Sequence, residues 1–593
     1  MVTKFEVLPN EILIQCFEHL NALDLFYSFD QLNYRFNYII RHIPLYVNLE
    51  GDINKSIFDQ FCNKTLLNPQ IKDEVYALNL PSFKDNNPEG LRTKLFLSIF
   101  LLEEFVNVQK LKTNADVNLI PMGTQSSHFS SKSTLEFSIT SFYKLRALYI
   151  SALDERSMSF ENINLSITNL TLQSCDLNSF HYLSKHVPML KYLHINQFHG
   201  SKDLSNKNTK QSCLYLKQLS IDYFGYSFDD FETLMQFTPN LKILTISAYD
   251  RDMIDAIKWE RLITSSLPCL DILQFEFKCW YPRGTQNIIN KLEEFQTNFW
   301  QTQHNWFIEY ALIYDSVLIY TIPYVVNTYE VTSNYKIYRN NLKNNVNTFV
   351  NVTNLKLNYE ILTDNYEDYF PNVTYLELDR KSASLTNQQI EYLGKIVNMF
   401  HLKHLDISQV YFTNSSVLIK LFERMPQLSV LSVASDQLSK IFNNDELCKY
   451  LNQIVKRLHI KGNYSLFDKD PFKRKEFYET FSKIEHLTFE YSRIEELSFS
   501  PSRLPKLSTV KAKWDTQYYP EHYLSQVENE VQELNVIYDI NVNQDYYTDL
   551  DCFGYENDSR RYGFSDRNYD RKKKPKTIRF DIEICMWFGN KMS

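Results

Sequence analysis

Apolar residues recur along this chain in a six-residue pattern whose first, fourth and sixth positions are apolar. The alternation over its last three positions is typical of a short strand with one buried face. A divergent copy starts at Val75. The other fourteen copies start at Leu145, Ile167, Leu190, Leu216, Leu241, Leu270, Val352, Val373, Leu402, Leu428, Val455, Ile484, Leu507 and Val531.

The spacing of these copies predicts a repeated strand and helix. Within each of two blocks, successive starts lie from 21 residues (Val352 to Val373) to 29 residues (Val373 to Leu402) apart. Several copies follow a proline, which ends a preceding helix and favours an extended chain. Segments between copies, such as 228–235 and 388–397, have helical spacing of their apolar residues. Because one such unit cannot bury its apolar face alone, neighbouring units are expected to stack and share a core.

The pattern resembles leucine-rich-repeat proteins, whose repeats run at about 20–29 residues. The resemblance implies an α/β fold class: a leucine-rich-repeat solenoid (horseshoe) with strands inside and helices outside. Its two blocks would occupy residues 47–290 and 351–540. Between them, residues 291–350 are either a β-rich insert, because period-2 alternation runs through WFIEYALIYDSVLIYTIPYVV, or divergent repeats.

The C-terminal part changes composition. Residues 541–576 are polar, charged and almost free of aliphatic side chains, which predicts a disordered loop. Its basic run at 571–576 is either a solvated charge run or a nuclear import signal. Residues 577–593 regain alternation and predict a final strand.

The first 46 residues predict a separate, small all-α head of three helices. Pro9 suits the first turn of a helix, and Asn21 and Asn33 are suitable N-caps for the second and third helices. A unit of about 40 residues is marginal in isolation. It also has more large apolar residues than so small a core can bury, so we expect it to dock onto the repeats, onto a partner, or onto both.

This segment resembles an F-box, on the Leu-Pro-x-Glu-Ile-Leu stretch that begins at Leu8 and on the apolar residues that follow. In that family the Leu-Pro face binds the Skp adaptor of a cullin–RING ubiquitin ligase. The resemblance therefore implies an F-box-like three-helix head, at residues 1–46, that binds such an adaptor. The alternative is an amphipathic cap over the first repeat. The residues that the resemblance assigns to adaptor binding are Leu8, Pro9, Ile12, Leu13, Phe17, Leu20 and Leu25.

Composition argues against several other functions. The chain has 593 residues, 63 basic and 71 acidic, for a net charge of −8, which argues against nucleic acid as the main ligand. Only 11 glycines occur, with no glycine-rich phosphate loop and no nucleophile elbow, so we expect no nucleotide cofactor and no catalytic activity. No stretch is apolar and long enough to span a membrane, and the first residues do not read as a signal peptide, so membrane association is not expected.

Cysteine and histidine patterns predict no metal site. The nine cysteines are widely spaced with no CxxC pair, which favours free thiols in a reducing compartment, cytoplasmic, nuclear or both. His401 and His404 have no third ligand nearby in the sequence and are better explained as a surface pair.

The sequence favours a binding surface as the functional feature. On each predicted strand, the residues that flank the core leucines point away from the core. We therefore nominate a ligand face made of Tyr192, His194, Tyr375, Glu377, His404, Asp406, Arg457 and His459. The resulting hypothesis is a non-catalytic substrate-recognition subunit of a Skp–cullin–F-box ubiquitin ligase, with a protein substrate. The alternative is a leucine-rich-repeat interaction scaffold without a ligase role.

Overall fold

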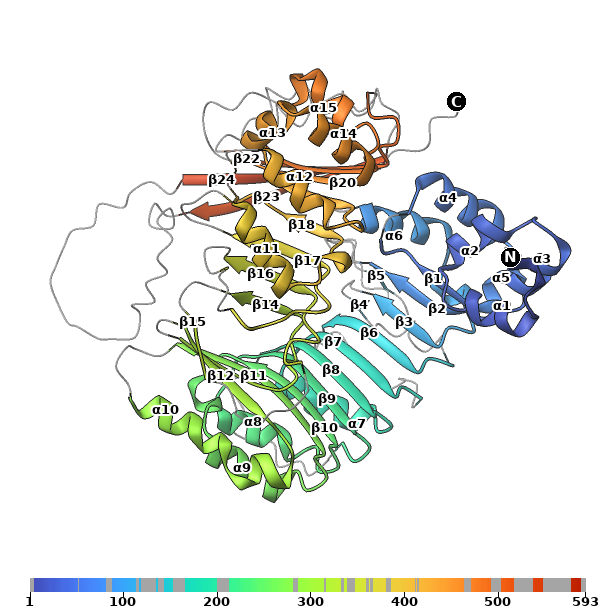
Figure 1. Cartoon of the computed structure of the whole chain (residues 1–593). Coiled ribbons are helices and arrows are strands. Elements are labelled where there is room, and N and C mark those ends of the chain that lie inside the picture. The colour runs from blue at the N-terminus through green and yellow to red at the C-terminus, as the bar shows by residue number, and fades with distance from the viewer. Residues whose placement is uncertain are drawn as a thin grey trace. The chain divides into compact units, whose positions relative to one another are not determined.

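The structure is a computed structural model, and it forms two compact units (Figure 1). The first unit comprises residues 1–85, 92–381 and 388–401, and the second comprises 86–91, 382–387 and 402–593. The structure describes residues 5–51, 53–81, 88–113, 117–118, 135–136, 143–152, 166–199, 213–280, 286–313, 316–331, 335–338, 347–358, 362, 366–379, 385–410, 412, 415–462, 471–491, 503–516, 537–547 and 577–587.

Three helices open the first unit: α1 (Asn10–Phe17), α2 (Ala22–Phe29) and α3 (Tyr34–Ile40). The Asn21 side chain accepts a hydrogen bond from the Leu23 N–H at the start of α2, and Asn33 accepts one from Phe36 at the start of α3. Both predicted N-caps are therefore present. The helices lead directly into β1 (Leu45–Asn48), which pairs in parallel with β2 (Val75–Leu80).

Further short elements lie between and after these strands. They are α4 (Lys55–Gln60), a π-helical turn η2 (Phe61–Thr65), α5 (Pro69–Glu74), α6 (Pro88–Ile99) and β3 (Lys110–Thr113). All belong to the same unit except residues 88–91 at the start of α6. The next six strands follow β3 side by side in sequence order, and all are parallel. They are β6 (Ala147–Ala152), β7 (Asn169–Cys175), β8 (Tyr192–Phe198), β9 (Gln218–Phe224), β10 (Ile243–Ala248) and β11 (Ile272–Trp280).

Helices α7 (Leu177–His186), α8 (Phe228–Met235) and α9 (Ala256–Ser266) pack against one face of these strands (Figure 1). Trp259 on α9 is fully buried, and its ring lies 5.1 Å from Phe231 on α8 and 5.6 Å from Phe277 on β11. The indole N–H donates to the Met253 carbonyl oxygen at 2.9 Å. Burying so large a ring with its one donor satisfied makes Trp259 a central residue of this core.

The segment 291–350 contains strands that run against the parallel direction. β12 (Ile308–Ile313) and β13 (Ser316–Thr321) form an antiparallel hairpin, and β13 pairs with β11. β15 (Tyr335–Tyr338) pairs with β12. A helix, α10 (Gln286–Glu293), precedes the hairpin, and β14 (Thr328–Val331) then pairs in parallel with β16 (Asn354–Asn358), which pairs with β17 (Tyr375–Asp379). Helix α11 (Asn387–Ile396) follows β17 in the chain.

The second unit again alternates parallel strands with helices. Its strands β18 (His404–Asp406), β19 (Val430–Ala434), β20 (Arg457–Lys461), β21 (His486–Tyr491) and β22 (Thr509–Thr516) pair in that order. Its helices are α12 (Ser415–Glu423), α13 (Ser435–Phe442), α14 (Asp445–Ile454) and α15 (Lys475–Thr480). Two long strands, β23 (Ile537–Tyr547) and β24 (Thr577–Trp587), pair with each other, and β24 pairs with β22, all antiparallel.

The predicted loop at 541–576 therefore begins inside β23, and the rest of it, 548–576, lies outside the described residues. That part includes the basic run at 571–576. The predicted final strand corresponds to β24, which ends at Trp587.

The six-residue pattern locates the strands closely. Each of the thirteen copies from Leu145 to Leu507 starts two residues before a strand, and the copy at Val531 lies outside the described residues. The fourth and sixth positions of each copy face the core: Leu193 and Ile195 on β8, for example, are 2% and 0% exposed. Strand register keeps equivalent positions side by side, as Leu193 pairs with Leu170 on one side and with Leu219 on the other.

The prediction of a leucine-rich-repeat solenoid (horseshoe) with a small all-α head is wrong, although the strands and helices do form an α/β-type fold. In the described residues the strands form two mostly parallel sheets of 12 and 10 strands, with helices packed on them and with antiparallel strands in both. A third sheet consists only of β4 (Val117–Asn118) and β5 (Leu135–Glu136). The helices α1–α3 are present, but they do not form a separate head. Asn21 bonds through its side chain to both the N–H and the carbonyl of Asn48 on β1, and Phe26 on α2 packs on Phe61, with ring centroids 6.0 Å apart. Three short helices cannot bury their own apolar side chains, so they share a core with the strands.

This shared core makes Asn21 a structural link as well as a helix cap. We expect Asn21→Ala to lower the free energy of unfolding by about 2 kcal/mol, because it removes an N-cap and two further hydrogen bonds to β1. Asn33→Ala is the matched control: it removes only the α3 cap and should cost about 1 kcal/mol. Urea unfolding of the full chain measures both. Equal losses in the two variants would contradict the role of Asn21 in joining helix to sheet.

Candidate functional site

Helix α1 carries two apolar stripes, one buried and one exposed. Leu13 and Phe17, four residues apart, are 0% and 1% exposed. Ile12 and Cys16, also four residues apart, lie along another side of α1, with Leu8 just before the helix and Leu20 just after it. Ile12 and Leu20 are 42% and 36% exposed, Cys16 is exposed and Leu8 is half-buried. We call these four residues the α1 stripe.

The seven residues assigned to adaptor binding therefore separate into two groups. Leu13, Phe17 and Leu25 belong to the interior and do not reach the surface. Leu8, Pro9, Ile12 and Leu20 lie at or near the surface. Beneath them is a cluster of aromatic rings, in which Phe17 lies 4.8 Å from Phe29 and 6.1 Å from Phe36 between centroids. The interior group thus fixes α1 in place, and the surface group is available for contact.

Arg35 on α3 fixes the chain just before α1. Its guanidinium donates to the carbonyl oxygen of Glu6 at 2.7 Å, to that of Leu8 at 2.5 Å and to the side-chain oxygen of Asn10 at 2.7 Å. The planar fork of an arginine suits such a set of fixed acceptors. Three bonds from one side chain therefore hold the Leu8–Pro9 segment in position at the start of the α1 stripe.

The nominated ligand face is divided between the two units. Tyr192 and His194 lie on β8 of the first unit, where Tyr192 is 46% exposed and the His194 ring is 2.9 Å from the Asp222 carboxylate on β9. Tyr375 and Glu377 lie on β17 of the same unit. Lys356 on β16 pairs with Glu377 at 3.4 Å and also with Glu330 and Asp379. The strand that carries Tyr192 and His194 therefore does not neighbour the strand that carries Tyr375 and Glu377.

The second unit brings three of the nominated residues together. The Nε2 of His404 on β18 lies 2.8 Å from the Ser432 hydroxyl on β19, and Nδ1 of His459 on β20 lies 3.4 Å from the same hydroxyl. The two imidazole rings cross nearly at right angles, with centroids 5.3 Å apart. Beside them Asp406 accepts a hydrogen bond from Lys461 at 2.7 Å and another from the Ser408 N–H at 2.9 Å.

The small side chains of β19 allow this arrangement. Asp406 and His459 lie on strands that both flank β19, and Ser432 pairs with each of them in the register. Ala434, two residues on, pairs with Lys461. Because serine and alanine project little from the sheet, side chains from β18 and β20 can meet above the strand between them. Arg457, the fourth nominated residue of this unit, is exposed. It lies two residues before His459 on β20 and pairs with Val430 and His486 on the neighbouring strands.

The environment of this polar cluster sets its charges. Burial, and then the neighbouring His459, lowers the pKa of His404 to about 4. Burial also lowers the pKa of His459. For Asp406, burial alone would raise the pKa, but the hydrogen bonds from Lys461 and Ser408 outweigh it and hold the pKa below its usual range. At neutral pH the cluster therefore holds two neutral imidazoles and one ion pair, whose carboxylate is buried and whose ammonium is partly exposed.

Access limits what this cluster can do chemically. A serine between two histidines is a familiar arrangement for nucleophilic catalysis, but Ser432 is only 1% exposed and Asp406 is also 1% exposed. A substrate atom cannot approach a hydroxyl that is enclosed in this way. The accessible parts of the cluster are the half-buried imidazoles and Lys461, whose side chain is 41% exposed. These groups suit contact with a partner's polar surface.

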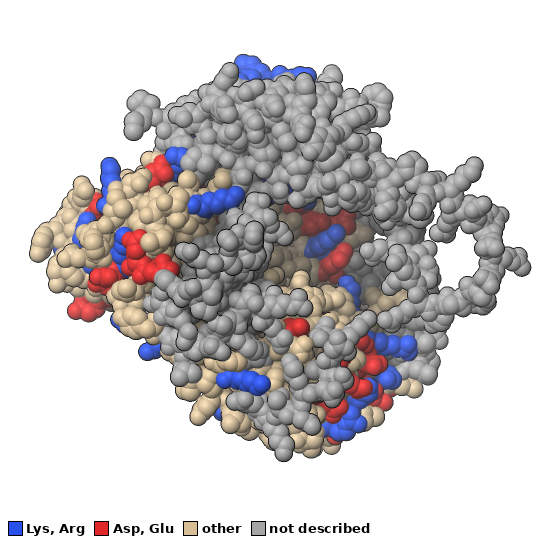
Figure 2. Space-filling view, turned by 180° about the vertical axis from the view of Figure 1, so that it is seen from behind, with Lys and Arg blue, Asp and Glu red and all other residues tan. Residues whose placement is uncertain are grey.

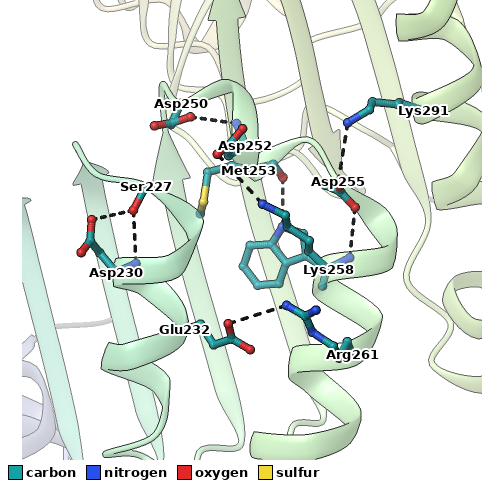
Figure 3. Close-up of polar contacts among 11 residues, drawn as sticks. Ser227, Asp230, Glu232, Asp250, Asp252, Met253, Asp255, Lys258, Arg261 and Lys291 are labelled. Carbon is teal, nitrogen blue, oxygen red and sulfur yellow. Dashed lines mark hydrogen bonds and ion pairs between the residues drawn. The ribbon is translucent and has the colours of Figure 1, made fainter.

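A second polar network ties the helices α8, α9 and α10 of the first unit together (Figure 3). Ser227 and Asp255 cap α8 and α9, and Asp255 also pairs with Lys291 of α10 at 3.6 Å. Glu232 on α8 pairs with Arg261 on α9 at 3.7 Å. Acidic and basic side chains consequently alternate over this region, at the lower right in Figure 2. Every member has a partner that explains it as a cap or a surface ion pair, so we interpret the network as structural.

The described residues contain no group of three or more His, Cys, Asp or Glu side chains placed to hold a metal ion. Free thiols are present at Cys16, Cys62, Cys175, Cys213, Cys269, Cys279 and Cys448. Within the described part of the chain, no helix combines the length and the apolar character that crossing a bilayer requires.

Sequence reasoning missed three residues of these surfaces. Lys461 follows His459 by two positions, so strand alternation places it on the same face, and Ser432 holds the corresponding position on the neighbouring strand. Lys461 and Ser432 could therefore have been predicted from the period-2 pattern. Arg35 could not have been predicted in this way, because its three acceptors lie 25, 27 and 29 residues away in the chain.

Comparisons with known proteins identify no family. No protein-family profile matches the chain, and no curated protein sequence matches it. Among solved structures, it is similar to a chain in the crystal structure of the Rad7 and Elc1 complex in yeast, at 14% sequence identity and a TM-score of 0.28. That similarity covers 55% of this chain and 79% of the other. A similarity this weak carries no functional argument.

The His404 pKa makes the stability of the second unit depend on pH. The unfolded imidazole titrates near pH 6.5 and the folded one at about 4, so the unfolded state binds more protons between these values. Stability is therefore fully present above pH ~6.5 and is lost as the pH falls toward ~4. We expect a loss of about 1–2 kcal/mol between about pH 7 and pH 5 from this residue.

Urea unfolding of wild type and His404→Gln at both pH values measures this loss. The variant should lose less stability on acidification than wild type does. His401→Gln, an exposed histidine three residues away, is the matched control and should behave as wild type. The same pH dependence in wild type and His404→Gln would show that His404 is not the responsible group.

Proposed function

We propose that this chain is a non-catalytic adaptor whose α1 stripe binds a Skp-type adaptor of a ubiquitin ligase and whose exposed strand faces bind a protein substrate. The observation that carries the proposal is the α1 stripe itself. It exposes Ile12 on α1 and Leu20 just after α1, a helix that Leu13 and Phe17 anchor in the core. Exposed apolar side chains in a row, on a rigid element, are typical of a protein-binding surface.

The F-box resemblance of residues 8–13 supports the choice of partner. In that family the Leu-Pro turn and the first helix contact the adaptor, and here Arg35 holds the Leu8–Pro9 turn by three hydrogen bonds. A fixed turn loses little conformational entropy on binding, so more of the contact energy remains as affinity.

The second unit supports a role in holding a protein substrate. His404, His459 and Lys461 offer a mixed surface of neutral imidazoles and one cation, and Arg457 lies beside them. Such a surface can donate hydrogen bonds to backbone carbonyls and carboxylates of a partner. The buried Ser432 and Asp406 support these side chains from below without meeting the partner.

A second candidate function has an observation of its own. The bonds between Asn21 and Asn48 join α2 to β1, as expected if the helices serve to cover the end of the first sheet. In that case the chain is a protein-interaction scaffold without a ligase role. The two functions differ in whether the exposed α1 stripe has a binding partner.

The α1 stripe gives a direct test. We expect Ile12→Ser/Leu20→Ser to weaken binding of a purified Skp-type adaptor to the full chain by about thirtyfold, which corresponds to about 2 kcal/mol. Biolayer interferometry measures the affinity. Tyr38→Ser removes a side chain that is 56% exposed on α3 and outside the stripe, so it is the matched control and should bind as wild type. Absence of adaptor binding by folded wild-type chain would reject the ligase role and leave the scaffold.

Arg35 provides an independent test of the same surface. It is not part of the stripe, so Arg35→Ala should weaken adaptor binding only by releasing the Leu8–Pro9 turn, by about three- to tenfold. Arg35→Lys should not restore affinity, because a single ammonium cannot reproduce the fork of three bonds. Amide hydrogen exchange of residues 6–10 should rise in both variants. An unchanged affinity together with increased exchange would mean that the turn does not contribute to binding.

A further inference from the structure

A row of cations lines the amino ends of the parallel strands in the first unit. The second position of each six-residue copy lies just before a strand, and four of the first six copies carry a basic residue there. These are Arg146 before β6, Lys191 before β8, Lys217 before β9 and Lys242 before β10. Thr168 occupies the position before β7, and Asp271 before β11 ends the row.

Backbone hydrogen bonds fix the order and spacing of this row. The Lys191 N–H donates to the Thr168 carbonyl, the Lys217 N–H to the Lys191 carbonyl, and the Lys242 N–H to the Lys217 carbonyl, each at 2.8 Å. Neighbouring members are therefore one strand apart, about 4.8 Å. From Arg146 to Lys242 the row spans roughly 19 Å, four strand spacings, along the strands that Figure 1 shows side by side.

The charges of the row are not neutralised within the part of the chain that the structure describes. Ion pairs nearby join other residues, such as His194 with Asp222 and Glu232 with Arg261, but no described carboxylate pairs with Arg146, Lys191, Lys217 or Lys242. Three of the four are exposed and Lys217 is half-exposed. Lysines held at adjacent strand positions repel one another, so this arrangement favours a ligand that brings negative charge.

Exposed apolar side chains accompany the cations. In the turns that lead into the same strands, Tyr143 is 59% exposed, Met189 39%, Leu214 56% and Tyr215 51%. Together with the four cations they form what we call the cationic rim. Its members are Tyr143, Arg146, Met189, Lys191, Leu214, Tyr215, Lys217 and Lys242.

We propose that the cationic rim binds an extended acidic protein segment in which carboxylates alternate with apolar side chains. The cations would pair with the carboxylates, and the apolar residues of the rim would cover the apolar side chains of the segment. At about 3.3 Å per residue, an extended segment of roughly six residues matches the span of the row. Alternation suits such a segment, because successive side chains of an extended chain point to opposite sides.

The apolar members of the rim include the aliphatic Met189 and Leu214 and the aromatic Tyr143 and Tyr215, so they suit a protein segment but do not by themselves distinguish it from a nucleic acid. The net charge favours a protein. The chain as a whole carries a net charge of −8, which repels a long polyphosphate. A short peptide contacts only the local row of cations, so the net charge of the chain affects its binding less. This proposal does not depend on adaptor binding by α1, which lies elsewhere in the same unit.

Fluorescence anisotropy with the full chain tests the proposal. The probe is a labelled peptide of about ten residues with alternating Glu and Leu, long enough to exceed the row, and a second peptide replaces each Glu with Gln. We expect the acidic peptide to bind and the Gln peptide to bind at least about tenfold more weakly. Raising the ionic strength from about 0.05 M to about 0.3 M should weaken binding of the acidic peptide further.

Charge reversal identifies the surface. Lys191→Glu/Lys217→Glu/Lys242→Glu should weaken binding of the acidic peptide by about tenfold or more. Lys64→Glu/Lys420→Glu/Lys449→Glu changes the net charge equally at exposed lysines outside the rim, and should bind within about twofold of wild type. Loss of binding in the rim variant alone supports the proposal.

Three results would overturn it: no binding of the acidic peptide by wild type, equal binding by the rim variant, or equal loss in the control. A labelled single-stranded DNA of matched charge is run in parallel. Binding of the DNA, lost in the rim variant, with no peptide binding would replace the protein segment with a nucleic acid as ligand. Adaptor binding, measured separately, should be the same in the rim variant as in wild type, so failure of one proposal does not imply failure of the other.

Discussion

The register between short parallel strands is the constraint on which both units depend. A strand such as β8 contributes only a few buried residues, and these are buried because Leu193 lies level with Leu170 and Leu219 on its neighbours. A shift of one residue would turn the whole apolar set to the opposite face. The helices pack onto this continuous apolar surface, as Trp259 does against Phe277. The surfaces of both units keep their positions because this register is kept from strand to strand.

The sequence could predict the strands because their signal is local. Each copy of the six-residue pattern carries its own core residues, and the prolines before several copies mark where a helix ends, so thirteen copies identify thirteen strands. Period-2 alternation also placed His404 and Asp406 on one face with His459. These predictions needed only residues within one repeat and the rule that side chains alternate along a strand.

The sequence could not predict features that depend on distant partners. Asn21 was recognised as a cap, but its bonds to Asn48 cross 27 residues, and they are what makes the helices part of the sheet rather than a separate head. The reversal of direction at β12 and β13 has the same apolar alternation as a parallel strand would have. The meeting of His404 and His459 depends on the small side chains of a third strand, β19. In each case the deciding residue belongs to another element.

The Arg35 fork also has a consequence for the order in which the chain acquires its structure. A ribosome releases the N-terminus first, yet the turn at Leu8 and Pro9 can be fastened only after Arg35 has left the exit tunnel. The bonds from Asn21 to Asn48 require still more of the chain, and β1 itself requires β2, which ends at Leu80. The apolar stripe of α1 is thus synthesised before the residues that fix it, which extend to Leu80. During that interval the exposed apolar side chains of α1 are available for binding by a chaperone.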